Sequence, residues 1–284
     1  MDRPLAGRIA VVTGASRGVG KGIALELGAA GATVYLTGRS AGAGPLPGTI
    51  AETAAEVTAL GGTGVAVRCD HHDDGQVAAV FKRIAVEAGR LDVLVNNVFS
   101  APDLAAWLTK PFWELPIRAW DEVLGIGARS HYVASVHAAP LLFAAGGGLI
   151  ANISSSGAAA YQQNTVYGVG KAAVDKMTAD TALELRPHHV AVVSLWPGLV
   201  RTELLAFAAR RTPEGRAVLD IPGAGAFDLA AAESPRFVGR GVVALASDPD
   251  VLNRSGTVET TADLAAAYGF TDVDGTLPGE IAPS

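Results

Sequence analysis

An apolar run close to the N-terminus leads directly into a glycine-rich turn and then into a second apolar segment with helical spacing. Residues 8–13 read RIAVVT, which suits a buried parallel strand, and glycines follow at positions 14, 18 and 20. Glycine permits tight turning and close approach to the backbone. A helix that starts at such a turn offers free N–H groups and a positive dipole end to an anion. The segment therefore predicts a strand, turn and helix that can hold a diphosphate, although an ordinary glycine-rich connection would show the same residues.

Strand-like and helix-like segments alternate along most of the chain. The predicted strands cover about residues 8–13, 33–37, 64–69, 91–96, 148–154, 190–196 and 256–260. The predicted helices cover about residues 19–30, 49–60, 74–89, 117–144, 166–186 and 235–246. No internal repeat or interdomain linker interrupts this alternation, which is typical of a parallel sheet covered on both faces. We expect residues 1–284 to form a single α/β domain with a Rossmann fold, in which helices cover both faces of a doubly wound, mainly parallel seven-stranded sheet.

The composition argues against several classes of protein. Hydrophobic residues make up 49% of the chain, enough for a large core, and the formal net charge of −6 indicates no basic face for nucleic acid. Gly, Pro and charged residues interrupt the apolar runs before they reach membrane-spanning length, and no secretory signal pattern is present. The only cysteine, Cys69, allows no intrachain disulfide and fits a reducing compartment. We expect a cytoplasmic protein with no membrane segment and no metal site.

Polar residues stand where three further predicted strands end. Asn96 and Asn97 end the run at 91–97, three serines at 154–156 follow the run at 148–153, and Pro197-Gly198 follows the run at 190–196. In a doubly wound sheet the carboxyl ends of the strands border the ligand crevice. These residues are therefore expected to meet beside the glycine-rich turn.

Tyr167 and Lys171 are four residues apart in a predicted helix, which places both side chains on one face, one turn apart. A free tyrosine has a pKa near about 10. A neighbouring ammonium favours the phenolate and lowers that pKa, which makes the pair a candidate general acid/base. Without its context the same spacing is also that of an ordinary surface pair.

In the order of these elements, from about residue 7 to residue 260, the chain resembles the short-chain dehydrogenase/reductase family. The resemblance rests on TGASRGVG at 13–20, Asn96-Asn97, the serines, YGVGK at 167–171 and Pro197-Gly198. It implies hydride transfer between a nicotinamide and a carbonyl or secondary alcohol. Tyr167 is then the general acid/base, Lys171 lowers its pKa and bonds the nicotinamide ribose, and a serine bonds the substrate oxygen. Ser155 fits the family pattern better than its two neighbours.

The resemblance also implies which residues bind the cofactor. The glycine-rich turn would wrap the diphosphate and adenosine ribose, Asp70 would reach the adenine, and Asn96 and Val98 would line the adenosine side. Thr202 matches a position that contacts the nicotinamide amide, and it is also a candidate cap for the helix that would start at Glu203. The remaining cofactor residues carried over are Gly14, Ser16, Arg17, Gly18, Val19, Gly20, Tyr167, Lys171, Pro197, Gly198 and Val200.

The end of the second predicted strand bears on the choice of cofactor. Residues 35–40 read YLTGRS, without the carboxylate that would hold the ribose hydroxyls of NAD. Arg39 stands where it could meet a 2′-phosphate, and Arg17 can add a second cation. We therefore expect NADP(H) to be favoured over NAD(H).

Three positions depart from the family pattern. Val98-Phe99 replaces the common Ala-Gly, and the bulk of Phe99 is expected to narrow the site. Gly127 stands where the family usually has an asparagine that helps to hold a water, so the catalytic set falls from four residues to three. We expect the Gly127 carbonyl and the space left by the missing side chain to hold water near Lys171. A non-catalytic NADP-binding protein, or an epimerase, dehydratase or lyase on the same fold, remains an alternative.

Three segments break the alternation and are candidates for lids or binding walls: residues 40–48, 98–116 and 199–234. By resemblance the last is the substrate-loop region. The apolar and aromatic character of the last two indicates a small hydrophobic carbonyl or alcohol substrate. Family members commonly pair through the helices that here span about 117–144 and 166–186, so we expect a homodimer or homotetramer.

Overall fold

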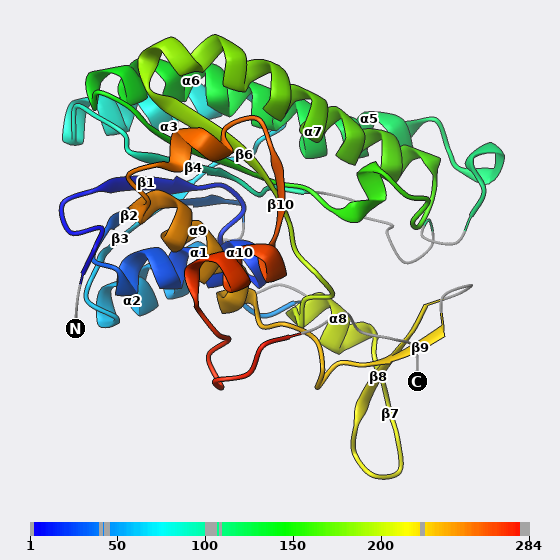
Figure 1. Ribbon diagram of the computed structural model, residues 1–284. Helices are drawn as coiled ribbons and strands as arrows, with labels where there is room; N and C mark the ends of the chain where they lie inside the picture. The colour runs from blue at the N-terminus through cyan, green and yellow to red at the C-terminus, as the bar shows by residue number, and fades with distance from the viewer. Residues whose placement is uncertain are drawn as a thin grey trace.

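Seven parallel strands form one sheet in the order β10-β6-β5-β4-β1-β2-β3, which confirms the predicted doubly wound α/β fold (Figure 1). The computed structural model describes residues 3–39, 42, 46–99, 107, 110–221 and 225–278. Parts of the three predicted loop segments, at 40–41, 43–45, 100–106, 108–109 and 222–224, lie outside the described residues. The strands of this sheet are β1 (Ile9–Val12), β2 (Thr33–Gly38), β3 (Thr63–Arg68), β4 (Val93–Asn96), β5 (Gly148–Ile153), β6 (Val190–Trp196) and β10 (Val258–Thr260).

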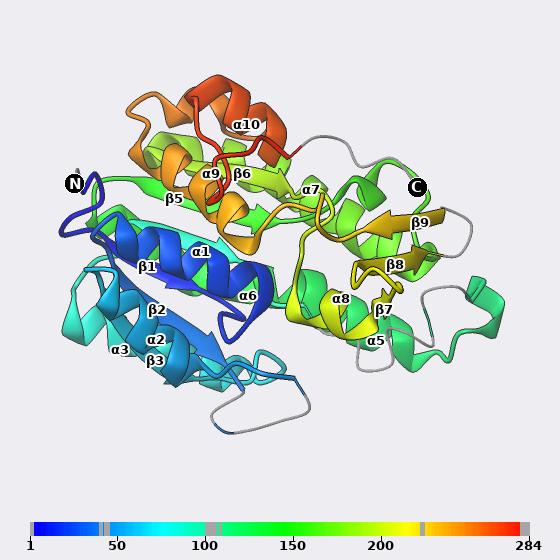
Figure 2. The same cartoon turned by 90° about the horizontal axis from the view of Figure 1, so that it is seen from below.

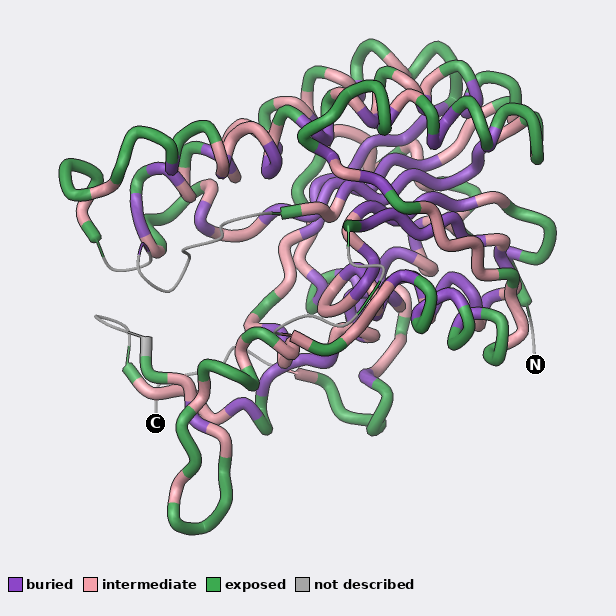
Figure 3. The backbone as a smooth tube through the Cα atoms, turned by 180° about the vertical axis from the view of Figure 1, so that it is seen from behind, coloured by how far each residue is buried: buried purple, intermediate pink, exposed green. Residues whose placement is uncertain are grey.

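The central strands are buried on both faces, as their continuous apolar runs predict. Successive side chains of a strand point to opposite faces. Val11 and Leu94 accordingly belong to one hydrophobic core, and Val12 and Val95 belong to the other. Figure 3 shows the buried backbone concentrated in the sheet and in the sides of the helices that cover it.

Helices cover both faces of the sheet (Figures 1 and 2). One layer contains α1 (Gly18–Ala29), α2 (Ile50–Ala59), α9 (Pro235–Ser247) and α10 (Thr261–Tyr268). The other contains α3 (Asp74–Glu87), α5 (Arg118–Leu124), α6 (Ser130–Ala144) and α7 (Thr165–Leu185). Short 3-10 helices lie at Phe112–Glu114, Ser156–Ala158, Arg186–His188 and Val251–Arg254. The predicted helix at 117–144 is in fact two helices, because a π-helical segment, Gly125–Arg129, separates α5 from α6.

The predicted substrate-loop region has structure that the sequence did not reveal. After α8 (Glu203–Ala208) it forms a small antiparallel sheet of β7 (Arg210–Arg211), β8 (Ala217–Ile221) and β9 (Gly225–Asp228). Its two ends are joined, since Arg201 N–H donates to the Glu233 carbonyl at 2.8 Å and Glu233 N–H donates to the Leu199 carbonyl at 3.0 Å. The region is therefore a closed excursion from the main domain, with a fixed base.

The chain after α10 folds back onto the start of α9. The Asp272 carboxylate accepts hydrogen bonds from Ser234 N–H at 2.7 Å and from Ser234 Oγ–H at 2.5 Å, and Ser234 caps α9. Arg240 on α9 donates to the Thr271 carbonyl at 2.5 Å. This contact fixes the excursion at the point where it re-enters the main domain. None of the helices in the described part of the chain has the length and apolar character needed to cross a bilayer.

Candidate active site

The glycine-rich turn is joined to the end of β4 by Asn97. Its side-chain amide donates to the carbonyls of Thr13 at 2.8 Å and Gly14 at 3.1 Å, and its backbone N–H donates to Thr13 Oγ1 at 2.9 Å. Gly14 has a φ of +68°, which favours glycine. A Cβ on Gly20 would lie 2.4 Å from the Asn97 amide nitrogen, so only glycine fits there. The packing of this carboxamide is therefore one reason why the turn needs glycine at position 20.

Asn96 occupies a different environment from the one predicted. Its side chain is fully buried and donates to Ser135 Oγ on α6 at 3.0 Å and to Asn152 Oδ1 on β5 at 2.9 Å. Asn152 in turn donates to Thr178 on α7 at 2.9 Å. The side chain therefore supports the α6–α7 layer and does not line the crevice, which leaves only its backbone as a candidate contact for a cofactor.

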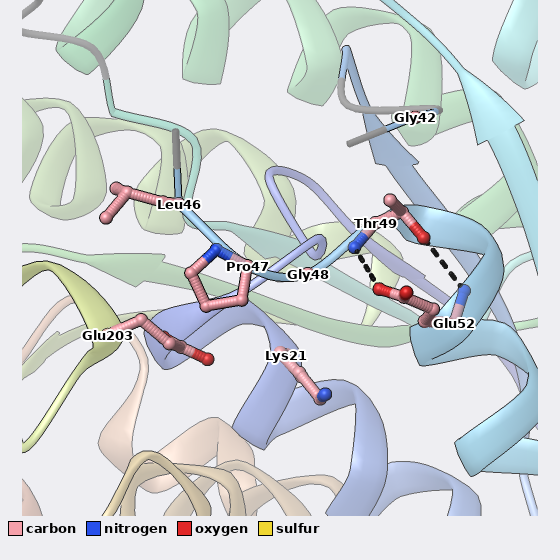
Figure 4. Close-up of a pocket in the computed structure, with 8 residues that line it drawn as sticks. All are labelled: Lys21, Gly42, Leu46, Pro47, Gly48, Thr49, Glu52 and Glu203. Carbon is pink, nitrogen blue, oxygen red and sulfur yellow. Dashed lines mark hydrogen bonds between the residues drawn. The ribbon is translucent and has the colours of Figure 1, made fainter. Parts of the chain in front are cut away.

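The N-terminus of α1 holds an anion supplied by the chain itself. Gly18 N–H, at the start of the helix, donates to Glu203 Oε2 at 2.8 Å. Free N–H groups and the helix dipole favour negative charge at this point. Glu203 lines a hollow of about 360 Å³ together with Lys21, Pro47 and Glu52. Figure 4 shows these side chains. A turn that already binds a carboxylate is suited to the diphosphate of a dinucleotide.

Arg17 has a structural role that the sequence did not predict. Its guanidinium donates to the carbonyls of Leu46 at 3.2 Å, Pro47 at 2.9 Å and Gly48 at 2.9 Å. These bonds hold the end of the loop between β2 and α2 against the glycine-rich turn. The expectation that Arg17 adds a second cation for a phosphate is therefore not supported, because this side chain is occupied with backbone carbonyls.

Arg39 shares a hollow with a second arginine, Arg68. Arg39, Arg68, Asp70 and Gln76 line a hollow of about 410 Å³ beside the carboxyl ends of β2 and β3. Arg68 was missed from the sequence, although its position as the last residue of the strand paired with β2 is the signal that could have identified it. Asp70 accepts a hydrogen bond from His72 N–H at 3.1 Å, and its own N–H donates to Gln76 at 3.0 Å. The hollow presents two cations and one carboxylate.

Two predicted residues after β6 are held by their own neighbours. Thr202 caps α8 by accepting a hydrogen bond from Leu205 N–H at 3.3 Å, which is the capping role that its place before Glu203 predicted. Its methyl group would lie 3.5 Å from a Cβ on Gly18, so it also borders the glycine-rich turn. Gly198 N–H donates to the buried Glu233 carboxyl at 2.9 Å, and burial raises the pKa of Glu233 to about 7.

The three serines after β5 separate clearly by geometry. Ser155 Oγ lies 2.8 Å from the Tyr167 hydroxyl, at hydrogen-bond distance. Ser154 is buried and donates to the Lys171 carbonyl at 3.3 Å, whereas Ser156 accepts a hydrogen bond from Gln162 at 2.8 Å. Of the three, Ser155 is therefore the one that the fold places against Tyr167.

Tyr167 lies in the first turn of α7, with Lys171 one turn further along. Asn164 caps this helix and accepts a hydrogen bond from Tyr167 N–H at 3.0 Å. The Lys171 ammonium donates to the Ile153 carbonyl at the end of β5, at 3.2 Å. Helix α7 and strand β5 therefore fix the two side chains beside Ser155.

The pKa values of the pair are governed by burial. Burial raises the pKa of Tyr167, opposed by the hydrogen bond with Ser155. This net direction is opposite to the lowering predicted from the spacing, because desolvation disfavours the phenolate. Burial lowers the pKa of Lys171 to about 8, opposed by the Asp175 carboxylate. Near neutral pH the tyrosine is therefore protonated and the lysine is mostly charged.

Phe99 fills the space that the sequence analysis assigned to water. Its ring packs edge-on against the Tyr167 ring, with centroids 6.0 Å apart and an interplanar angle of 85°. A Cβ on Gly127 would lie 3.3 Å from one carbon of the Phe99 ring and 3.5 Å from another. The expectation of extra space over Gly127 is wrong, since an aromatic side chain from the end of β4 occupies it.

The residues predicted for the site follow the carboxyl ends of β1, β4, β5 and β6, with Tyr167 and Lys171 in the helix after β5. Arg39 and Asp70 lie further out, after β2 and β3. Among the described residues, no cluster of three or more His, Cys, Asp or Glu side chains is arranged to hold a metal ion.

Comparison with known proteins gives consistent matches. The sequence pattern of the family described as short chain dehydrogenase matches residues 8–212. Dehydrogenase/reductase SDR family member 1 is 47% identical over 279 residues in Mus musculus and in Homo sapiens, covering 97% of this chain and 86% of each relative. Cis-4-hydroxycyclohexanecarboxylate dehydrogenase of Sinomonas cyclohexanicum is 32% identical over 258 residues, 86% of this chain and 97% of its own.

Solved structures resemble the fold over nearly its whole length. A protein of Xanthomonas campestris described as a dehydrogenase is 28% identical, with a TM-score of 0.81 over 99% of this chain and 97% of its own. A metagenomic short-chain oxidoreductase in complex with NADP is also 28% identical, with a TM-score of 0.67 over 87% of this chain and 93% of its own. On the family pattern and the relatives together, the chain belongs to the short-chain dehydrogenase/reductase family of oxidoreductases.

Proposed function

We propose that this protein is an NADP(H)-dependent oxidoreductase that interconverts a carbonyl compound and a secondary alcohol. The observation that carries the proposal is the 2.8 Å contact between Ser155 Oγ and the Tyr167 hydroxyl, with the Lys171 ammonium anchored one turn away. The residues after β4 connect these groups to the glycine-rich turn, since Asn97 bonds the turn and Phe99 packs against Tyr167. At that turn the N-terminus of α1 accepts a carboxylate.

In the proposed reaction a bound nicotinamide would supply the hydride that the carbonyl carbon accepts. Tyr167 donates its proton to the carbonyl oxygen, and Ser155 donates a hydrogen bond to the same oxygen. The raised pKa of Tyr167 keeps the hydroxyl protonated before reduction, and the Lys171 ammonium stabilises the phenolate that remains. A proton from solvent then restores the tyrosine, and the alcohol is oxidised by the reverse path.

A preference for NADP(H) is supported by the charges beside β2 and β3. Arg39 and Arg68 line one hollow, and no carboxylate ends the second strand. Arginine can bond two oxygens of a phosphate with its planar fork. The similar metagenomic oxidoreductase described in complex with NADP is consistent with the same choice.

We further propose a small hydrophobic substrate and a homodimer or homotetramer in the cytoplasm. One relative is named for the oxidation of a ring-bearing hydroxy acid, which fits a secondary alcohol. The outer faces of α6 and α7 expose Tyr132, Val136 and Leu183, which favours pairing of these helices. Cys69 is buried and unpaired, as a reducing compartment allows.

The test measures NADPH consumption by absorbance over a panel of hydrophobic ketones and aldehydes. Turnover in the parent that is lost in Tyr167→Phe, with NADPH binding retained, supports the proposal. NADPH binding without turnover on any carbonyl would favour a non-catalytic cofactor-binding protein. Product analysis separates reduction from epimerisation, dehydration or lyase chemistry.

A further inference from the structure

The Phe99 ring touches three parts of the candidate active site at once. Lys171 Nζ lies 5.3 Å from the ring centroid, closer than the 5.8 Å that separates it from the Tyr167 ring. Gly127 packs under the same ring, which is 36% exposed. We propose that Phe99 is a positioning residue that holds the Lys171 ammonium beside Tyr167, and that position 127 must lack a side chain because the Phe99 ring covers it. This inference rests on the proposed function of the Tyr167–Lys171 pair.

The ammonium has few other partners to hold it in place. An ammonium carries three donors, and within the described residues that of Lys171 donates one hydrogen bond, to Ile153 O at 3.2 Å. A ring face attracts a cation, and more strongly when the cation is removed from water. The Phe99 ring therefore adds an attraction to this single hydrogen bond.

The charged and titratable groups around the ammonium are few. Tyr167 and Asp175 lie on its own helix, and Asp175 favours the charged lysine. On α6, His131 has a pKa lowered to about 3, mainly by burial and next by Lys171, so it is neutral near neutral pH. A change confined to Phe99 leaves all three groups in place.

Gly127 lies in the π-helical segment and is buried under the ring. A Cβ there would already approach the ring to 3.3 Å, and an asparagine would add three more heavy atoms beyond that point. A larger side chain at position 127 would therefore require the Phe99 ring to move from this position. Gly125, two residues earlier in the same segment, has no atom within 4 Å of an added Cβ and offers a matched control.

The first test measures the titration of Lys171 directly in the full-length protein. The chain has five lysines, so ¹³C-labelled lysine gives five side-chain signals, and Lys171→Met identifies one of them. Phe99→Leu keeps an apolar side chain but removes the ring face. A cation–π contact favours the ammonium, so its loss should lower the Lys171 titration midpoint by about 0.4–1.5 pH units. An unchanged or higher midpoint for Lys171 would overturn the proposal, and the other four lysines serve as internal controls.

The second test measures steric coupling by thermal unfolding. Alanine is favoured over glycine in helices, so Gly125→Ala should raise Tm by about 1–4 °C with or without Phe99. Gly127→Ala should lower Tm in the parent but raise it, like the control, in the Phe99→Ala background. An equal effect of Gly127→Ala in both backgrounds would show that the ring does not exclude a side chain at position 127.

Neither measurement needs a substrate, so the inference and the proposed function can fail separately. A parent protein that turns over no carbonyl, yet shows both expected effects, refutes the proposed function and leaves the contact between Phe99 and Lys171 established. A parent that reduces carbonyls but shows neither effect refutes the role of Phe99 alone.

Discussion

The Glu203 carboxylate occupies the N-terminus of α1, where we propose that the dinucleotide diphosphate binds, and this leads to a prediction about affinity. Glu203 Oε2 accepts the hydrogen bond of Gly18 N–H at 2.8 Å, at the positive end of α1. A diphosphate that uses the same N–H must displace the carboxylate and then tolerate its charge nearby. Glu203→Gln keeps a side-chain oxygen of the same reach but removes the charge, so NADPH should bind more tightly to the variant.

The size of the gain follows from the two kinds of hydrogen bond. A bond to a charged acceptor contributes roughly 1.5–3 kcal/mol and a neutral bond roughly 0.5–1.5 kcal/mol, so the displaced contact weakens by about 1 kcal/mol. This difference corresponds to a roughly fivefold lower Kd. Because Glu203 is partly exposed, salt screens its charge, and the gain should shrink as ionic strength rises.

The assay measures the Kd of each protein for NADPH by calorimetric titration, at low and at high salt. Glu52→Gln is the matched control, because Glu52 lines the same hollow but bonds Thr49 N–H at 2.9 Å in a capping box that glutamine can also complete (Figure 4). The control should bind NADPH with the affinity of the parent. If Glu203→Gln binds NADPH no more tightly than the parent, or if Glu52→Gln gains as much affinity, then the Glu203 carboxylate does not compete with the diphosphate.

Four further outcomes are expected. Tyr167→Phe should reduce turnover by roughly 10²–10⁴-fold with Tm unchanged, and a loss smaller than tenfold would contradict its role as general acid/base. Arg39→Ala and Arg68→Ala should each weaken the binding of NADPH by roughly ten- to a hundredfold in titrations but leave the binding of NADH unaffected. Equal losses of affinity for both cofactors would contradict a 2′-phosphate site. The pKa of Glu233 is raised in the fold to about 7, so its contribution to stability is full below about pH 4.5 and is lost as pH rises through 7. Glu233→Gln should therefore unfold a few degrees higher than the parent at pH 8, an advantage that disappears by pH 5, and parallel Tm–pH curves would contradict this. Light scattering at micromolar concentration should show a dimer or tetramer, and a monomer would refute the assembly.

The main sheet could be predicted from the sequence because its strands are continuous apolar runs that end in glycine or polar residues. The excursion could not, because the residues of β7, β8 and β9 mix charge with glycine and pair only through contacts between segments. The π-helical segment at Gly125–Arg129, which separates α5 from α6, could not be predicted from the sequence either. Two glycines in that segment weaken the helical pattern only locally, and the reason for Gly127 is a ring that lies 28 positions earlier in the chain.

The burial of the Asn96 side chain has a simple geometric cause. Adjacent residues of a strand point to opposite faces, so a shift of one position exchanges the core for the crevice. The sequence shows two carboxamides in a row, and the family pattern alone assigned the cofactor contact to the first. In the structure the first carboxamide joins the α6–α7 layer, and Asn97 is the one that reaches the glycine-rich turn.

The end of β4 connects the two halves of the candidate site. Asn97 supports the glycine-rich turn, the Val98 carbonyl accepts a hydrogen bond from the buried His131 at 3.1 Å, and Phe99 packs over Lys171. Because the low pKa of His131 keeps its ring neutral, this bond stays a neutral N–H to carbonyl contact across the physiological range. Three consecutive residues therefore reach the glycine-rich turn, the buried His131 of α6 and the Tyr167–Lys171 pair through one short piece of backbone. A displacement of that backbone would move the support of the glycine-rich turn and the position of the ammonium together, so the proposed cofactor binding and the proposed proton transfer would depend on the same structural element.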